Sequence, residues 1–427
     1  MSYPVAITGF GFLAPTGTEP EALWQALEGR ADLRGPWPKR PLDDTYPVDG
    51  VVAVPEAVWA ETAALAAHAE DSSAGRAAGI AEHMVGAALA GAGLEDPAAA
   101  AAVGRIGCFL ATTTAGVEAA EADRVAPEAG AAPARRLDGS AIVPRRPGGW
   151  TGPTAVLSTA CSSGLLAPAL AIDALVAGEA EAMVAGGLDV LLEYTICGFN
   201  GLRLVAPDGC RPFAAGRRGA VLSEGGAAVC LEPLDTALAR GAPIHAVITG
   251  YGMSCDAGHA TAPDPTGIAK AVRGALVSAG AEPDAIGGIF AHATGTLAND
   301  AAEIQALRTA FGREALPPLT GVKSILGHAQ AGAGSLTLVA AILALEHDRL
   351  PPTAGLAERD PELGAIDVVA EPGRRPAART LMVDAFGFGG NNCVVTIAGP
   401  EAASGLLARA GEAASAGAAA GPMAGEG

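Results

Sequence analysis

The sequence predicts an α/β protein built from two successive layered halves. Its 427 residues exceed what one ordinary hydrophobic core holds, so two core-forming units are expected. Strand-like apolar runs alternate with helical runs, and the pattern starts again near Gly241. We therefore expect an N-terminal half over residues 1–241, a C-terminal half over 242–399 and a low-complexity Ala/Gly/Glu tail over 400–427.

The first half is expected to contain strands before and after a surface segment over residues 118–150. A strand in PVAITGFGFLAP precedes helices over residues 19–29 and 73–93. A strand in RIGCFLATTT precedes residues 118–150, whose Glu, Ala, Pro, Arg and Gly content indicates a surface segment. The remaining elements are a strand over 155–158, a helix over 162–176, a buried strand in AEAMVAGGLDVL and two short strands in GAVLSEGGAAVCLEP.

The second half repeats this alternation with fewer interruptions. A strand in IHAVITGYGMS is followed by a helix in GIAKAVRGALVSAG, and a strand in AIGGIFAHATGT runs into a loop. SLTLVAAILALEHD is typical of a helix, and TLMVDAFGFGGNNCVVTIAG of two strands joined by a glycine loop.

Composition excludes several classes of function. The net charge of -19 disfavours nucleic acid and anionic membranes as partners, because both present phosphates that need a basic face. No apolar run is long enough to span a membrane, and MSYPVAITGFGF does not resemble a secretory signal. The seven cysteines show no CxxC pair, so we expect no metal site, reduced thiols and a cytoplasmic location.

Cys161 is the first candidate for chemistry. It lies in STACSSG, between a strand and a helix, among small residues that leave room for a thioester. The positive end of the helix dipole is expected to lower its pKa and favour the thiolate. The alternative is a buried structural cysteine, so the interpretation needs partner residues.

Two histidines could supply those partners. His292 lies in AHATGT after an apolar strand, and His328 lies in a glycine-rich turn before an apolar helix. Such junctions form the rims of α/β active sites, although either histidine alone could be an ordinary loop residue.

The loop DAFGFGGNN, residues 384–392, is the last candidate. Its three glycines let backbone N–H groups point at a ligand. No GKS or GKT follows, which argues against a phosphate loop, and an oxyanion hole beside a thiolate fits better.

Six motifs in this order carry a family resemblance: STACSSG, CRPF…LSEGGA, SCDAGHATAPDP, AHATGT…NDAAE, KSILGHAQAGAG and FGFGGNN. Together they resemble the β-ketoacyl-acyl-carrier-protein synthases of the elongating class, over residues 4–399. The resemblance implies a thiolase fold, with five αβαβα layers built from two similar halves. It also implies an acyl carrier protein as partner, and either a homodimer or a heterodimer with a chain-length-factor-like subunit.

The resemblance implies roles for individual residues. Cys161 matches the nucleophile that takes an acyl chain from carrier-protein phosphopantetheine, with no other cofactor. His292 and His328 match the pair that binds malonyl thioester, and Lys323 matches the active-site lysine. The remaining matches are the gating and oxyanion residues Phe386 and Gly387, the acyl-pocket residues Phe199 and Thr114, the supporting residues Thr296, Asp300 and Glu303, and Arg203 for carrier-protein docking.

The chain departs from the family pattern at three positions. Thr337 stands where a glutamate usually pairs with the lysine, so Glu303 or Asp300 compensates, or the lysine is neutral or more hydrated. Ala293 replaces a glycine after His292, and Pro168 is expected to kink the helix that follows Cys161.

The resemblance implies decarboxylative Claisen condensation of a Cys161-bound acyl chain with malonyl-acyl-carrier protein. Stand-alone synthases of type II polyketide or aryl-polyene pathways are the nearer match within the family. Alternatives are a non-condensing partner subunit resembling a chain length factor, or an acyltransferase on the same fold. A degradative thiolase is disfavoured, since Cys393 lies after FGFGGNN rather than at the expected place for a second cysteine.

Overall fold

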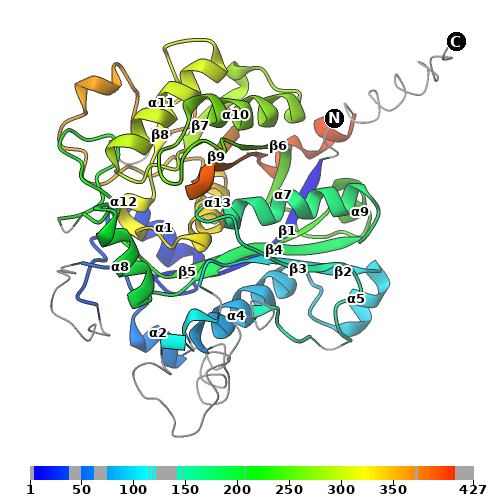
Figure 1. Ribbon diagram of the computed structural model, residues 1–427. Coiled ribbons are helices and arrows are strands. Elements are labelled where there is room, and N and C mark those ends of the chain that lie inside the picture. Colours follow the sequence, from blue (N-terminus) through cyan, green and yellow to red (C-terminus); the bar gives the residue numbers. More distant parts are fainter. Residues whose placement is uncertain are drawn as a thin grey trace, which may run out of the picture.

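The computed structural model shows two half-sheets with helices outside and between them (Figure 1). It describes residues 4–37, 50–61, 75–114, 116–118, 120–121, 142–146, 148–206, 208–370 and 374–408. Most of the predicted tail and much of the predicted surface segment therefore lie outside the described residues.

The ten strands of the described residues form one sheet in the order β3-β2-β4-β5-β1-β6-β10-β9-β7-β8. The strands of the N-terminal half are β1 (Val5–Leu13), β2 (Ile106–Ala111), β3 (Thr154–Leu157), β4 (Ala182–Asp189) and β5 (Gly225–Pro233). Those of the C-terminal half are β6 (Ala246–Cys255), β7 (Ile286–Phe290), β8 (Leu319–Thr320), β9 (Thr380–Gly387) and β10 (Asn391–Ala398).

The two halves repeat one topology. In the N-terminal half, β3, β2 and β4 pair in parallel, and β5 and β1 continue the sheet through antiparallel pairs. In the C-terminal half, β8, β7 and β9 pair in parallel, and β10 and β6 continue it through antiparallel pairs. The halves join where Val5, Ala6 and Ile7 of β1 lie antiparallel to β6. This repeat is the arrangement that the thiolase fold requires.

The helices make the other three layers. They are α1 (Pro20–Gly29), α2 (Glu56–Glu61), α4 (Gly75–Gly91), α5 (Pro97–Val103), α7 (Ser163–Val176), α8 (Glu193–Gly201), α9 (Leu234–Ala239), α10 (Pro265–Ala279), α11 (Leu297–Phe311), α12 (Lys323–Leu326) and α13 (Ala331–Glu346). Figure 1 shows α4 outside the N-terminal half-sheet, α10 and α11 outside the C-terminal one, and α7 and α13 between them.

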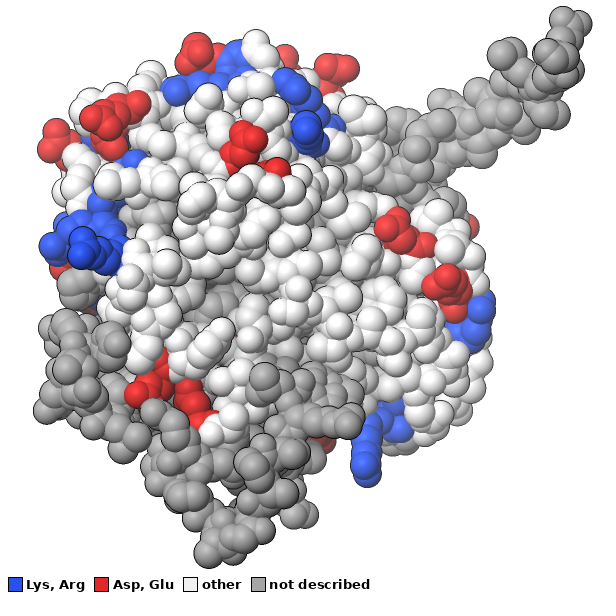
Figure 2. All heavy atoms as spheres, in the orientation of Figure 1, with Lys and Arg blue, Asp and Glu red and all other residues white. Residues whose placement is uncertain are grey.

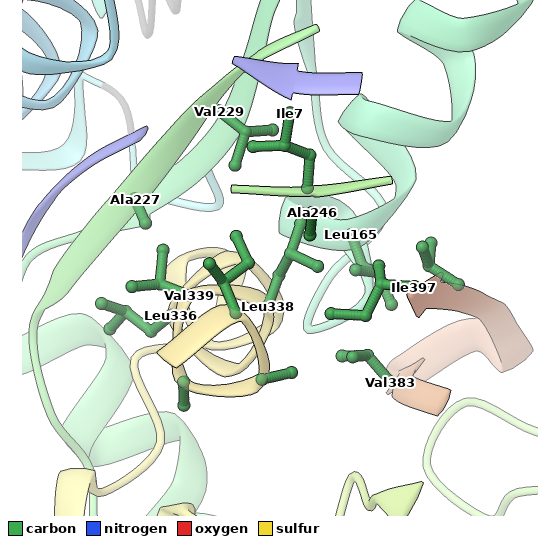
Figure 3. Packing of buried hydrophobic residues seen from close by; sticks show 14 of the residues in the cluster. Ile7, Leu165, Ala227, Val229, Ala246, Leu336, Leu338, Val339, Val383 and Ile397 are labelled. Carbon is green, nitrogen blue, oxygen red and sulfur yellow. The ribbon is translucent and has the colours of Figure 1, made fainter. Parts of the chain in front are cut away.

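The helix α13 of the central layer is buried on all sides. Every residue of α13 from Ala331 to Leu345 is buried, as expected for a helix that is apolar around its whole circumference. In Figure 3 the α13 side chains lie among residues of both half-sheets, including Ile7, Val229, Val383 and Ile397. The sheet-packed central helices give the site a rigid base.

The N-terminal ends of α7 and α13 meet closely. A Cβ at Gly164 would lie 2.1 Å from the Ala331 carbonyl oxygen, so only glycine allows this approach. The helix α7 is continuous through Pro168, which removes the hydrogen bond that the Gly164 carbonyl would otherwise accept. Cys161 and His328, just before these two helix starts, are thereby brought to the same region.

The first of the two strands predicted in GAVLSEGGAAVCLEP does not form. Of the two strands expected in GAVLSEGGAAVCLEP, the structure forms only β5, and the first segment makes single bridges. One of these joins Leu222 to His328: the His328 N–H donates to the Val221 carbonyl at 2.7 Å, and Ser223 N–H donates to the His328 carbonyl at 3.1 Å. This segment fixes the backbone of His328 instead of extending the sheet.

Candidate active site

Cys161 lies on a tight turn between β3 and α7. Ala160 has a φ of 55°, a left-handed conformation that is uncommon outside glycine. The Ser163 hydroxyl holds the turn, because it donates to the Ala160 carbonyl at 2.6 Å and accepts the Thr159 N–H at 2.7 Å. The Cys161 residue is 5% exposed, which leaves its sulfur at the base of a cavity rather than on the surface.

Burial raises the pKa of the Cys161 thiol to about 12. The Lys323 ammonium and the backbone N–H groups of Phe388 and Cys161 act in the opposite direction, and the Asp189 carboxylate adds to the rise. The sequence-based expectation of a lowered pKa is therefore wrong for the resting site, because desolvation outweighs the helix end and the positive neighbour. The resting nucleophile is a thiol.

His292 and His328 face one another across the same cavity. Their ring centroids are 5.7 Å apart and their planes are crossed at 87°. Burial and the Lys323 charge lower the pKa of His328 to about 3, and the same causes hold the pKa of His292 well below its usual value. Both rings are neutral imidazoles at physiological pH.

Lys323 and Glu303 fix the main chain of His292. The Lys323 ammonium donates to the His292 carbonyl oxygen at 2.6 Å and lies 3.4 Å from His292 Nδ1. Glu303 accepts the N–H groups of His292 and Ala293 at 2.7 and 2.9 Å. Ala293 takes a φ of 46°, so this chain holds an alanine in the left-handed conformation next to the histidine.

Thr337 stands where a glutamate was expected to pair with Lys323, so another group must compensate the lysine charge. Burial lowers the pKa of Lys323, and Glu303 is the strongest influence in the opposite direction. Thr337 donates its hydroxyl within its own helix, to the Ala333 carbonyl at 2.8 Å. The lysine is 3% exposed, and Glu303 provides the main compensating charge through the His292 peptide.

Asp300 has a separate structural task. It lies 3.3 Å from Arg217, which also pairs with Asp360, and it accepts the Phe213 N–H at 2.9 Å. Thr296 caps α11 by accepting the Asn299 N–H at 3.3 Å. These contacts fix the start of the helix that carries Glu303.

The glycine loop places a different phenylalanine beside the sulfur than the one predicted. The backbone N–H that reaches Cys161 is that of Phe388. Phe386 lies inside β9, opposite Asn392 of β10, and its ring packs 5.5 Å from the His292 ring. The prediction for Phe386 as the oxyanion residue is wrong because the strand continues through Gly387 and the chain leaves the ladder only at Phe388.

Two cavities meet at Cys161. The first, of about 620 Å³, is lined by both histidines, Thr294, Thr296, Phe386 and Gly387. The second, of about 690 Å³, is lined by Thr113, Tyr194, Leu202 and Gln330. Cys161, Phe199 and Phe388 line both, and the two phenylalanine rings lie 5.6 Å apart. A group bound to the sulfur can therefore extend away from the histidines.

Thr114 does not line this second cavity. It is fully buried and donates its hydroxyl to Asp189 at 2.7 Å, as Thr112 also does. Thr113 is the threonine at the cavity wall. The prediction of Thr114 as a pocket residue is wrong by one position: all three threonine hydroxyls donate to Asp189, but only Thr113 remains partly exposed.

Two loops at the first cavity are linked to one another. Asn392 donates to Asp256 at 2.7 Å, and Asp256 accepts the Asp264 N–H at 2.9 Å. The Gly389 N–H donates to the Ala260 carbonyl at 2.8 Å. The turn that carries Phe388 is thus tied to the loop that forms the cavity mouth.

Arg203 follows α8 and is exposed, in a left-handed conformation with a φ of 57°. Two neighbouring arginines, Arg211 and Arg218, pair with Asp208. Figure 2 shows basic side chains in small groups with acidic ones nearby, rather than as one broad basic face. In the described ranges no group of three or more His, Cys, Asp or Glu side chains could hold a metal, and no helix is long and apolar enough to cross a membrane.

Comparison with protein families identifies the fold. Residues 2–237 match the β-ketoacyl synthase N-terminal domain, and residues 245–357 match its C-terminal domain. The chain belongs to the β-ketoacyl synthase family. This confirms the resemblance on which the sequence-based hypothesis depended.

Individual relatives agree with this membership. Nodulation protein E of Rhizobium meliloti is 39% identical over 249 residues, 58% of this chain and 62% of that protein. The 3-oxoacyl-[acyl-carrier-protein] synthase 2 of Synechocystis sp. is 36% identical over 260 residues, again 62% of the relative. Each alignment thus spans under two-thirds of the relative. The solved ishigamide ketosynthase/chain length factor aligns at a TM-score of 0.83 with 30% identity, covering 93% of this chain and all of that one.

Proposed function

We propose that this β-ketoacyl synthase joins a Cys161-bound acyl group to malonyl-acyl-carrier protein by decarboxylative Claisen condensation. The observation that carries the proposal is the cavity where Cys161 meets two neutral, crossed imidazoles. A nucleophile that can hold a thioester and a pair of neutral N–H donors are the two requirements of this chemistry.

The first half-reaction is transfer of an acyl group to Cys161. The Cys161 sulfur attacks an acyl thioester, its proton leaves with the departing phosphopantetheine thiol, and a new thioester forms. Because burial raises the thiol pKa, attack depends on charge stabilisation at that moment. The Lys323 ammonium and the Phe388 N–H supply it.

The second half-reaction uses the histidines. Since Lys323 Nζ faces His292 Nδ1, the neutral ring carries its proton on Nε2 and can donate it to a malonyl thioester oxygen. His328 is the second neutral ring at the same cavity. When the malonyl C–C bond breaks and carbon dioxide leaves, the negative charge collects on this oxygen, where N–H donors stabilise it.

The carbon–carbon bond then forms at Cys161. The enolate carbon attacks the acyl carbonyl of the Cys161 thioester, and the N–H groups of Cys161 and Phe388 stabilise the resulting oxyanion. Collapse of this intermediate breaks the C–S bond and releases β-ketoacyl-acyl-carrier protein. The sulfur leaves as a thiolate near Lys323 and then takes a proton from solvent.

The proposal extends to partners and setting. An acyl carrier protein presents both thioesters on phosphopantetheine, with no resident cofactor, and Arg203 contributes to its docking. The second subunit is an identical copy or a chain-length-factor-like chain, in the cytoplasm. The likeness to the ishigamide ketosynthase/chain length factor supports a chain-length-factor-like partner, and we propose a specialised type II polyketide pathway rather than membrane fatty acid synthesis.

Intact-protein mass measurement with a panel of acyl-carrier-protein thioesters tests the proposal. We expect an acyl adduct on the wild type and on Cys255→Ala, which removes the exposed thiol, but not on Cys161→Ala. Addition of malonyl-acyl-carrier protein should discharge the adduct and yield β-ketoacyl-acyl-carrier protein. An adduct that is only transferred onward would favour the acyltransferase, and no adduct from any donor would favour a non-condensing partner subunit.

A further inference from the structure

Asp384 is the unexplained residue of this site. It lies in β9, is fully buried, and neither of its carboxyl oxygens has a hydrogen-bond partner within the described structure. The other buried carboxyl groups near the cavity, Asp189, Asp300 and Glu303, each accept at least two backbone or hydroxyl hydrogens. A buried polar group without partners is unfavourable and needs a reason.

The pleat of β9 sets the direction of the Asp384 side chain. Leu381, Val383 and Ala385 pack into the central core, whereas Met382 and Phe386 pack into the core beneath α10 and α11. Asp384 lies two residues from both Met382 and Phe386 and therefore shares their face of the strand. Its carboxyl group faces the α11 side. Its neighbour on that face, Phe386, contacts the His292 ring.

The charged neighbours of Asp384 are part of the catalytic surroundings. Glu303 on α11 raises its pKa and Lys323 on α12 lowers it, with burial as the largest influence. On β10, the Cys393 thiol also feels the Asp384 charge. The strand β7 carries no titratable side chain, and those of α7 and α13, Asp173 and Glu346, pair elsewhere with Tyr251 and His245.

Hydrogen bonding decides which carboxyl group is ionised. Burial raises the pKa of Glu303 to about 7, and its two short backbone N–H bonds act in the opposite direction and favour its charged form. Asp384 accepts none within the described structure, so of these two carboxyl groups it is the one that gains least from being ionised. Lys323 and Glu303 then balance one another across the His292 peptide.

We propose that Asp384 is a positioning residue for the condensation, a buried carboxylic acid that leaves Glu303 as the single anion at the His292 peptide. This inference rests on the proposed function. Ionisation of Asp384 would add a second negative charge that acts on Glu303 and Lys323, the two side chains that hold the His292 main chain. The neutral acid therefore keeps the site suited to binding an oxyanion.

Infrared difference spectroscopy tests the protonation directly and needs no activity. Wild type minus Asp384→Asn should show the carbonyl stretch of a protonated carboxylic acid near neutral pH. The control Asp367→Asn removes an exposed carboxylate that pairs with Arg374, and should show no such band. Absence of the band in the Asp384 difference would overturn the proposal.

The pH dependence of stability gives a second test. A folded-state pKa above the unfolded value of about 3.9 means that the wild type loses stability as pH rises between those two values. The melting temperature of Asp384→Asn relative to the wild type should therefore increase as the pH rises above about 4. A constant difference would contradict the inference, as would a difference that decreases. Asp384→Ser is a smaller neutral variant for use if the asparagine variant does not fold.

The positioning role has its own readout. Asp384→Asn should lose the alkaline decrease in condensation rate, so that the ratio of the variant rate to the wild-type rate rises by about tenfold per pH unit above the Asp384 pKa. A uniform decrease at every pH would indicate a structural role only and would overturn the positioning claim. If the enzyme does not catalyse the condensation, the infrared and stability measurements still test the protonation of Asp384 independently of the proposed function.

Discussion

Lys323 and Glu303 hold His292 from opposite sides of its main chain. The Lys323 ammonium donates to the His292 carbonyl at 2.6 Å, and Glu303 Oε1 accepts the His292 N–H at 2.7 Å. The two oppositely charged side chains thus bind opposite polar groups of the same main chain. This arrangement orients a histidine without a direct salt bridge and puts a positive charge close to its ring.

The first prediction concerns Lys323→Met. Because the Lys323 charge lowers the pKa of both histidines, its removal should raise those pKa values. The acid limb of malonyl decarboxylation should move to higher pH by about one unit, and the rate at neutral pH should fall by about 10- to 100-fold. A pH profile of carbon dioxide release measures both effects.

Lys270→Met is the matched control for this prediction. Lys270 is an exposed residue of α10, away from both cavities. Its removal should leave the profile unchanged. An unmoved acid limb in Lys323→Met would mean that the lysine acts only by holding the His292 carbonyl.

The second prediction concerns Asp189→Asn. Asp189 accepts the hydroxyl groups of three threonines and the Ala331 N–H, and so ties the end of β4 to the start of α13. An asparagine offers one acceptor oxygen in place of two and places an N–H₂ group against donors. We expect a loss of about 2–4 kcal/mol in the free energy of unfolding, measured by urea denaturation. Asp367→Asn, at the surface, should change it by less than about 0.5 kcal/mol.

The third prediction compares two glycines. A Cβ at Gly164 would overlap the Ala331 carbonyl at 2.1 Å, whereas Gly86 in α4 has open space around the corresponding position. Gly164→Ala should separate the starts of α7 and α13, lower the melting temperature and slow acylation of Cys161. Gly86→Ala should instead stabilise the helix by about 0.5–1 kcal/mol. Equal effects of the two substitutions in thermal unfolding would contradict the close approach.

Much of the fold followed from local patterns. Strands and helices with clear apolar periods, such as β1, α10 and α13, are where the sequence predicts them. The helix α11 was not predicted, because its first turns bury Asn299, Asp300 and Glu303 and so interrupt the apolar period of its buried residues. Its usable signals were its ends: Thr296 as N-cap and Gly312 in a left-handed C-cap.

The site residues show a similar division. Motifs predicted that Cys161, His292, His328 and Lys323 belong together, and the structure brings them to one cavity or its immediate surroundings. The choice between Phe386 and Phe388 depends on where β9 leaves its pairing with β10, which the alternating phenylalanines and glycines do not reveal. The sequence does not indicate a role for Asp384, because its electrostatic interaction with Glu303 joins two elements that are far apart in the chain.

The last prediction concerns the reactivity of the resting nucleophile. With a pKa of about 12, Cys161 should be alkylated by iodoacetamide far more slowly at neutral pH than the exposed Cys255. The rate at Cys161 should rise about tenfold per pH unit while the fold persists, because only the thiolate reacts. Lys323→Met should slow it further, since the ammonium lowers the Cys161 pKa. Peptide mass spectrometry separates the two thiols, and rapid, pH-independent labelling of Cys161 would show that the resting site holds a thiolate.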